Sequence, residues 1–193
     1  MDHRIFRWIN RLADHTGWAH RVFTTYAKYG IVLFAALLVV AYLDGRRNDD
    51  LDGVAGSVWA GGAALVALEI GQLIGGPIDR ARPYEAMTGV HVLVAKSTDF
   101  SFPSDHATAV GAVAVGLFLA NRRWGTIAGV LAVIMACTRV YVGAHYPSDV
   151  VAGLALGGLV AAAGRFGVVP ALRRVAAWLS RTRLRMLVAS GEA

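Results

Sequence analysis

Long apolar runs alternate with short polar segments along this chain, and the pattern predicts membrane-spanning helices. Runs of about 17–25 residues with few charges are long enough to cross a bilayer as helices. Such runs lie at residues 22–43, 53–74, 104–120, 124–143 and 147–164. Their connections are short and polar, except for a longer one at residues 75–103. We therefore expect an all-α, integral-membrane helical bundle of about five transmembrane helices, folded as a single domain over residues 1–193.

Amphipathic spacing replaces continuous apolar runs at both ends of the chain. Four apolar residues from Ile5 to Leu12 recur at i, i+3, i+4 and i+7, so residues 1–20 are expected to form a helix on the membrane surface. If this helix inserts, the bundle has six transmembrane helices. Residues 165–193 carry six arginines, and a further span there would bury Arg173 at high cost. We expect them to form a basic amphipathic tail on the membrane surface.

The composition supports a membrane protein and argues against a nucleic-acid partner. Hydrophobic residues make up 56% of the chain and charged residues 17%, whereas soluble domains have roughly 45–50% and about 25%. The net charge of +6 comes from arginines near span ends and in the tails, which are suited to lipid head groups. The single cysteine, Cys137, excludes an internal disulfide. We expect membrane lipids as partners, and the sequence carries no signal for an oligomeric state.

The segment from Thr138 to Asp149, TRVYVGAHYPSD, joins two predicted spans and concentrates ionisable residues. Pro147 favours a helix start at residue 146 or 147, which places His145 beside a helix N-terminus that favours an anion. Asp149, in the first turn, can reach back to a ring nitrogen of His145. With Arg139 nearby, such an imidazole is suited to act as nucleophile or base toward a phosphate-sized charge. Interface anchoring at helix ends remains the alternative for this stretch alone.

A second cluster reaches the same membrane face. In a five-span bundle, the connection at residues 75–103 and the turn at residues 144–147 emerge on one side. Arg82, followed by proline, presents a guanidinium that matches phosphate oxygens. Ser104 is a good N-cap, and His106 lies at the start of an otherwise uncharged span. Arginines and a helix N-terminus suit a phosphoryl group, and two histidines suit a nucleophile and a general acid.

Three ordered motifs resemble the signatures of the type 2 phosphatidic acid phosphatase superfamily. They are Arg82-Pro83, Pro103-Ser104-Asp105-His106, and Arg139 followed by His145 and Asp149. The longer forms SFPSDHA and TRVYVGAHYPSDV look closest to its bacitracin-resistance branch, the undecaprenyl-diphosphate phosphatases. The similarity covers nearly the whole chain, including its length and the layout of its spans.

The resemblance implies a role for each motif residue. His145 would attack phosphorus to form a phosphohistidine, Asp149 would orient it, and His106 would protonate the leaving group. The phosphoryl oxygens would be held by Arg82, Ser104 and Arg139. The family needs no metal, and we expect neither a metal nor another cofactor.

Two positions depart from the superfamily pattern. A lysine seven residues before Arg82 is replaced by Gly75, and the usual glycine between the serine and the histidine is replaced by Asp105. The aspartate is typical of the bacitracin-resistance branch, and we place it among the candidate phosphate-binding residues. Lys96 could supply the missing lysine contact, or it could be a solvated loop residue. Glu69, inside the second span, is either an edge residue of the site or a partner for a neighbouring helix.

These observations favour an enzyme that converts undecaprenyl diphosphate to the monophosphate and inorganic phosphate, recycling the cell-wall carrier lipid in the bacterial plasma membrane. A phosphatidate or phosphatidylglycerophosphate phosphatase would use the same chemistry on another lipid. A non-catalytic lipid-binding or transport protein is the alternative of another class, but internal repeats and broken midplane helices are not evident. Ten of the 19 Lys and Arg residues lie opposite the site and nine on its side, two of them phosphate ligands, which favours an outward-facing site.

Overall fold

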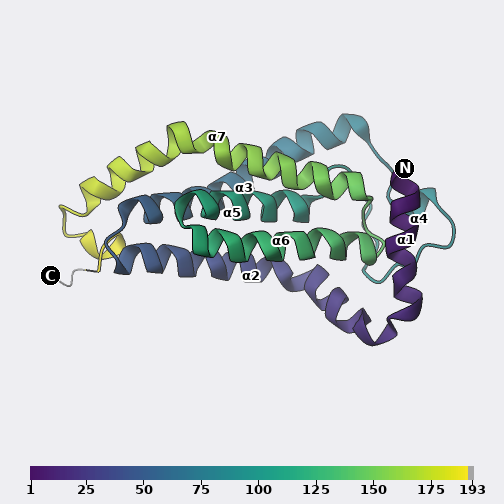
Figure 1. Ribbon diagram of the computed structural model, residues 1–193. Helices are drawn as coiled ribbons and strands as arrows, with labels where there is room; N and C mark the ends of the chain where they lie inside the picture. The colour runs from purple at the N-terminus through teal and green to yellow at the C-terminus, as the bar shows by residue number, and fades with distance from the viewer. Residues whose placement is uncertain (191–193) are drawn as a thin grey trace.

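The computed structural model describes residues 1–190, and no strand occurs among them. Five long helices lie side by side as a bundle, and one helix near the N-terminus crosses the end of this bundle (Figure 1). The helices are α1 (Asp2–His15), α2 (His20–Arg47), α3 (Leu51–Ile78), α4 (Pro83–Ala86), α5 (Asp105–Ala120), α6 (Arg122–Tyr141) and α7 (Pro147–Leu179), with short 3₁₀ helices η1 (Gly17–Ala19) and η2 (Arg185–Leu187).

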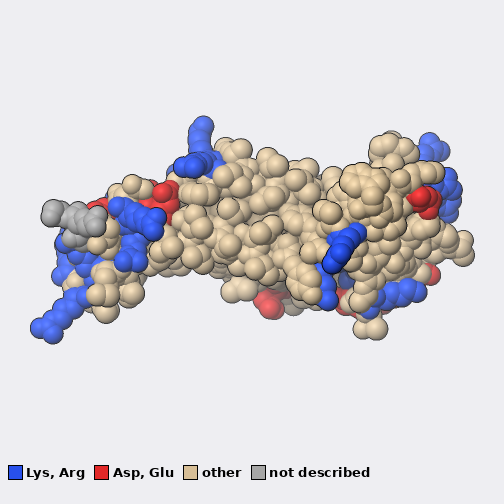
Figure 2. All heavy atoms as spheres, turned by 90° about the horizontal axis from the view of Figure 1, so that it is seen from below, with Lys and Arg blue, Asp and Glu red and all other residues tan. Residues whose placement is uncertain are grey.

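The five predicted spans correspond to α2, α3, α5, α6 and α7, and the all-α bundle is confirmed. Four of these helices are long and apolar enough to cross a membrane, and α5 is a shorter apolar helix. Seen from below, uncharged side chains cover most of the middle of the molecule, while Lys and Arg lie mainly toward its two ends (Figure 2). This distribution fits an apolar bilayer core between two polar interfaces, and the chain is a membrane protein.

The far end of α7 differs from the prediction. The sequence predicts a span ending near residue 164 and a basic amphipathic tail from residue 165, but α7 is one helix of 33 residues that continues through Pro170. Its length of about 50 Å exceeds a hydrocarbon core of about 30 Å, so its arginine-bearing end extends beyond that core. Arg173 Nε lies 2.9 Å from Asp52 Oδ1, and Ala176 joins an apolar cluster with the start of α3. The predicted end of the helix near residue 164 is therefore wrong, because periodicity does not show this packing.

The close approach of α5 and α7 fixes the positions of the residues at the starts of these two helices. Every residue from Ala107 to Ala114 is buried. A Cβ on Gly157 would lie 2.0 Å from the carbonyl oxygen of Thr108, and one on Gly111 would lie 2.7 Å from the carbonyl oxygen of Leu154. Both contacts allow glycine alone, so the two helix backbones touch and their starts are held in a fixed register.

The predicted N-terminal surface helix, α1, packs against the bundle. The face that it buries is not the one marked by the apolar residues spaced from Ile5 to Leu12. Trp8 is exposed, as a helix at a membrane interface requires, while Phe6, Asn10 and Ala13 are buried. The Asn10 side chain donates to the carbonyl of His91 at 2.9 Å and accepts from its N–H at 2.9 Å. A polar residue therefore faces inward, because it satisfies loop backbone that would otherwise be unpaired.

Candidate active site

A cavity of about 230 Å³ lies at the end of the bundle that α1 crosses. Its walls come from the starts of α4 and α5, the end of α6, the loop before α7 and the loop between α4 and α5. The lining residues are Arg82, Tyr84, Ala95, Ser97, Asp99, Asp105, His106, Arg139, Ala144 and His145. Five residues proposed from the sequence are among them, so the fold brings together motifs that are far apart along the chain.

His145 is buried and lines this cavity, with both ring nitrogens engaged. Nδ1 lies 2.8 Å from the carbonyl oxygen of Ser101, which can only accept, so Nδ1 carries the hydrogen. Nε2 therefore has the lone pair, and guanidinium N–H groups of Arg82 and Arg139 donate to it at 3.2 and 3.3 Å. The lone pair of His145 Nε2 therefore lies within hydrogen-bond distance of two guanidinium groups.

Electrostatics keep this imidazole uncharged. Burial lowers the pKa of His145 well below 6.5, and the positive charges of Arg139 and Arg82 lower it further. A neutral imidazole is the form that can attack phosphorus, so the surroundings of His145 favour its nucleophilic state.

Arg82 is held in place by a partner that the sequence did not reveal. Its guanidinium donates to the Asp99 carboxylate, with Nη2 and Oδ1 2.6 Å apart, and to the Asp99 carbonyl at 3.1 Å. Partial burial acts to raise the pKa of Asp99, but a hydrogen bond from Ser97 and the charge of Arg82 outweigh it and lower that pKa. Asp99 is therefore ionised and fixes the direction of the Arg82 guanidinium.

The Asp149 carboxylate does not hydrogen-bond directly to His145. Its Oδ2 lies 3.9 Å from His145 Nδ1, beyond hydrogen-bond distance. Fully buried, it accepts instead from the Ser101 hydroxyl, from the Tyr146 N–H at 2.9 Å and from Arg80. Since the Ser101 carbonyl accepts from His145, Ser101 links the carboxylate to the imidazole. The predicted contact between Asp149 and His145 is thus replaced by an indirect one.

Arg80 connects this buried carboxylate to the N-terminal helix. Its Nη2 donates to Asp2 at 2.6 Å, and its Nη1 donates to Asp149 and, at 2.7 Å, to the Ser148 hydroxyl. The guanidinium lies 4.0 Å from the centre of the Tyr146 ring. Asp2 also accepts from the Ser148 N–H at 3.0 Å. The start of α1 is therefore part of the support of the site.

Ser104 and Asp105 lie at the start of α5 with contacts that differ from those expected. Ser104 occupies the N-cap position, but its buried hydroxyl has no hydrogen-bond partner in residues 1–190 and is not part of the cavity wall. Asp105 lines the cavity and accepts from Gln72 Nε2 at 3.1 and 3.2 Å. The Asp105 carboxylate is thus held by Gln72 at the cavity wall.

The structure explains why a lysine is absent at position 75. A Cβ on Gly75 would lie 2.1 Å from the Phe100 ring and 2.4 Å from the carbonyl oxygen of Phe102. The loop that carries Ser101 occupies the space that a longer side chain would need. Lys96 does not line the cavity; its Nζ lies 5.6 Å from the centre of the ring of Tyr84, which does line it.

His106 and Glu69, the two other ionisable residues that the sequence places within predicted spans, lie in different surroundings. His106 is half-buried and lines the cavity. Glu69 is exposed, does not line the cavity, and forms no ion pair or side-chain hydrogen bond within residues 1–190. In that same part of the chain, no three His, Cys, Asp or Glu side chains gather as a metal-binding group.

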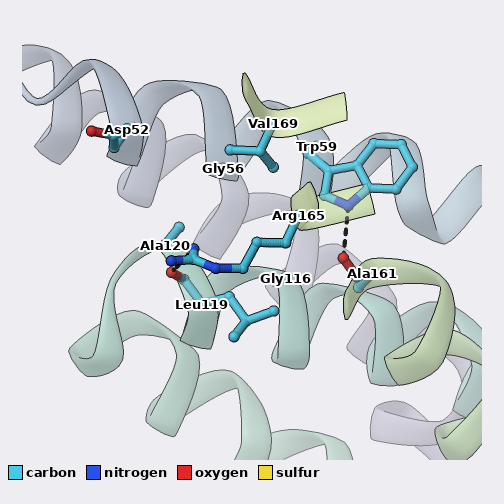
Figure 3. A pocket seen from close by; sticks show the side chains of 9 residues that line it. All are labelled: Asp52, Gly56, Trp59, Gly116, Leu119, Ala120, Ala161, Arg165 and Val169. Carbon is cyan, nitrogen blue, oxygen red and sulfur yellow. Dashed lines mark hydrogen bonds between the residues drawn. The ribbon is translucent and has the colours of Figure 1, made fainter. Parts of the chain in front are cut away.

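A second cavity, of about 280 Å³, lies where the start of α3, the end of α5 and the middle of α7 meet (Figure 3). Arg165 reaches across it and donates to the carbonyl of Leu119 at 2.9 Å. Trp59 donates from its indole to the carbonyl of Ala161 at 2.9 Å. The lining contains no histidine, and its one acid is Asp52. This cavity therefore has no nucleophile comparable to His145.

The fold and the motif geometry agree with the sequence family. Residues 57–168, more than half of the chain, match the PAP2 superfamily, and the chain belongs to this family. It is a membrane phosphatase of the PAP2 type.

Individual relatives define the comparison further. The undecaprenyl-diphosphatase BcrC of Bacillus subtilis is 30% identical over 80% of this chain and 77% of its own. A decaprenylphosphoryl-5-phosphoribose phosphatase of Mycobacterium tuberculosis is 39% identical over 67% of each chain. The crystal structure of Aquifex aeolicus LpxE shares the fold, with a TM-score of 0.65 and 23% identity over 86% of this chain and 94% of its own.

Proposed function

We propose that this protein hydrolyses undecaprenyl diphosphate to undecaprenyl phosphate and inorganic phosphate through a phosphohistidine, and thereby recycles the cell-wall carrier lipid. The observation that carries the mechanism is the neutral, buried His145, whose Nε2 accepts from both Arg82 and Arg139. The diphosphate substrate is supported by the similarity to the BcrC diphosphatase over most of both chains.

In the first step, His145 Nε2 forms a bond to the terminal phosphorus while the bond from that phosphorus to the bridging oxygen breaks. Arg82 and Arg139 stabilise the charge on the phosphoryl oxygens in the transition state. His106 donates a proton to the departing oxygen, and undecaprenyl monophosphate leaves. Ser101 holds His145 Nδ1 throughout, so the lone pair of Nε2 stays directed into the cavity.

In the second step, water attacks the phosphohistidine. The neutral His106 left by the first step accepts a proton from this water, which bonds to phosphorus as the bond between nitrogen and phosphorus breaks. Inorganic phosphate is released, and both histidines regain their starting states. Asp149 stabilises the arrangement through Ser101, because its carboxylate is itself held by Arg80 and by the Tyr146 N–H.

A monoester-lipid phosphatase is the competing function, since the mycobacterial relative is named for a phosphoribose substrate. Purified protein in detergent should be assayed for phosphate release from undecaprenyl diphosphate, phosphatidate and phosphatidylglycerophosphate. We expect the highest kcat/KM for the diphosphate. A higher value for either monoester would contradict the proposed substrate, and no release from any lipid would contradict the enzymatic mechanism.

We place the protein in the bacterial plasma membrane with the His145 cavity on the outer side. The support is the slight excess of Lys and Arg on the opposite side once the two phosphate ligands, Arg82 and Arg139, are set aside. A cysteine introduced at the exposed position Arg181 should be labelled by a membrane-impermeant thiol reagent only after cell lysis, in a Cys137→Ala background. Labelling of intact cells would reverse the orientation.

A further inference from the structure

A third cavity, of about 390 Å³, adjoins the His145 cavity on the side of α2. Ala95, His106 and Arg139 line both cavities and form the boundary between them. The other walls of the third cavity come from Thr24, Ala27, Lys28, Leu93 and Val94. His106, the general acid in the proposed mechanism, therefore faces both cavities.

Lys28 gives this adjoining cavity a positive charge. It is one of only two lysines in the chain, and it is exposed. Thr24 lies one turn earlier on α2, so its hydroxyl shares a face with Lys28. Lys28 forms no ion pair within residues 1–190, and its Nζ lies 5.0 Å from the centre of the Tyr29 ring. Its ammonium group is thus available to an anion.

The guanidinium of Arg139 connects the two cavities physically. Its Nη2 donates to His145 Nε2 at 3.3 Å, and its Nη1 donates to the carbonyl of Ala27 at 3.4 Å. Ala27 directly precedes Lys28, so this contact holds the Lys28 turn of α2 beside the site. The Nε of Arg139 is buried and has no partner among the described residues. Arg139 therefore contributes positive charge to the walls of both cavities.

A diphosphate lipid requires two neighbouring anion sites, whereas a monoester lipid requires one. With the terminal phosphorus over His145, the bond that breaks points away from Nε2, because attack and departure occur in line. The departing oxygen then lies on the His106 side, and the phosphate that stays on the lipid lies beyond His106. Leu93 and Val94 provide apolar wall for the first part of the prenyl chain.

We propose that the cavity beside α2 is the leaving-group site, and that Lys28 binds the phosphate that remains on the lipid. This inference rests on the proposed diphosphatase function and makes Lys28 the residue that favours diphosphates over monoesters. A monoester lipid places only uncharged chain in this cavity, so Lys28 contributes little to its turnover. If Lys28 instead only anchored α2 at the membrane interface, its substitution would change the turnover of both substrates alike.

The experiment compares farnesyl diphosphate with farnesyl monophosphate, which share one lipid and differ by one phosphate. The full chain is purified in detergent as wild type, Lys28→Met, Lys28→Arg and, as a matched control, Arg21→Met. Arg21 is an exposed cation on the same helix that does not line the third cavity. For each protein, kcat/KM is measured on both substrates, and size-exclusion profiles are recorded.

Loss of a charge-assisted contact corresponds to roughly 10- to 100-fold in kcat/KM. We expect Lys28→Met to show this loss on the diphosphate and a change within about threefold on the monophosphate, with Lys28→Arg close to wild type. Arg21→Met should leave both substrates unchanged. Equal losses on the two substrates, or no loss on the diphosphate, would overturn the role of Lys28 while leaving the diphosphatase function intact. A wild-type protein that hydrolyses only the monophosphate would overturn both.

Discussion

The two ends of the bundle each contain a cavity with an arginine, yet only one end is equipped for phosphoryl transfer. The cavities are similar in size, at about 230 and about 280 Å³. At the α1 end, Arg82 and Arg139 donate to a histidine lone pair. At the other end, Arg165 donates to the carbonyl of Leu119. The difference lies in what the guanidinium groups face, not in cavity volume or in the presence of arginine.

The environment of each arginine explains this difference. Leu119 is in the last turn of α5, where backbone carbonyls lack partners within the helix. Arg165 donates to this carbonyl, and its positive charge interacts favourably with the negative end of the helix dipole. Arg139 is buried and forms no ion pair within residues 1–190. Arg82 is paired with Asp99 but also points toward the neutral nitrogen of His145, so the buried positive charge of the two arginines is only partly matched. Buried cations without full compensation favour an anionic ligand. An anion site is therefore recognised by unmatched buried charge.

The largest effect is expected for His145→Ala. Removal of the nucleophile should lower kcat/KM by roughly 10⁴- to 10⁶-fold on diphosphate and monoester lipids alike. Phosphate release by the purified variant measures this, with size-exclusion elution and thermal unfolding as checks that the protein is folded. A folded variant with near-wild-type turnover would remove the covalent mechanism.

His106→Ala should separate the two substrate classes. General-acid catalysis contributes roughly 10²- to 10⁴-fold, and most when the departing oxygen is basic. A monoester lipid leaves as an alkoxide, whereas a diphosphate leaves as a much less basic phosphate. We therefore expect a larger loss on farnesyl monophosphate than on farnesyl diphosphate. Equal losses would show that His106 positions the phosphate instead of donating a proton.

A matched pair of arginine substitutions tests the comparison between the two ends. Arg82→Lys retains the charge but not the planar fork, and should lower kcat by roughly 10²- to 10³-fold. Arg165→Lys at the other cavity should change kcat by less than about twofold, because it affects an exposed helix cap. Both are measured on farnesyl diphosphate. Similar losses in the two variants would refute the distinction.

Ser101→Ala should have the smallest effect at the active end. It removes the hydroxyl that donates to Asp149 but keeps the carbonyl that accepts from His145. We expect a loss of about 1–3 kcal/mol in stability, from a buried carboxylate oxygen with one fewer donor. The kcat should fall about tenfold, equivalent to about 1.4 kcal/mol. Thermal unfolding and steady-state kinetics measure the two effects, and an unchanged kcat would exclude Ser101 as the link.

Much of the bundle was predictable because each span is a long run of apolar residues. The start of α7 was also predictable, since Pro147 fixes a first helical turn. The end of α7 was not, because the helix continues through Pro170 and the packing of Ala176 against Val54 appears only in the folded chain. The inward face of α1 was missed for a similar reason, because Asn10 is buried against loop backbone.

The site shows the same division. Motif spacing predicted that Arg82, Arg139 and His145 meet, and the structure brings them together. The supporting residues Arg80 and Ser101 were not identified, since their contacts with Asp149 arise only when the loops fold over the start of α7. One signal was present: Ser101 is the first residue of the longer motif SFPSDHA, and Arg80 lies two residues before Arg82.

The most direct test of the central claim is to trap the phosphoryl group on His145. Farnesyl diphosphate labelled with ³²P in its terminal phosphate is mixed with the enzyme, and the reaction is quenched rapidly in alkali. We predict protein-bound label that is stable to alkali and labile to acid, that maps to the peptide containing His145, and that is absent from His145→Ala. Continued turnover without labelled protein, or label that persists in His145→Ala, would contradict the account.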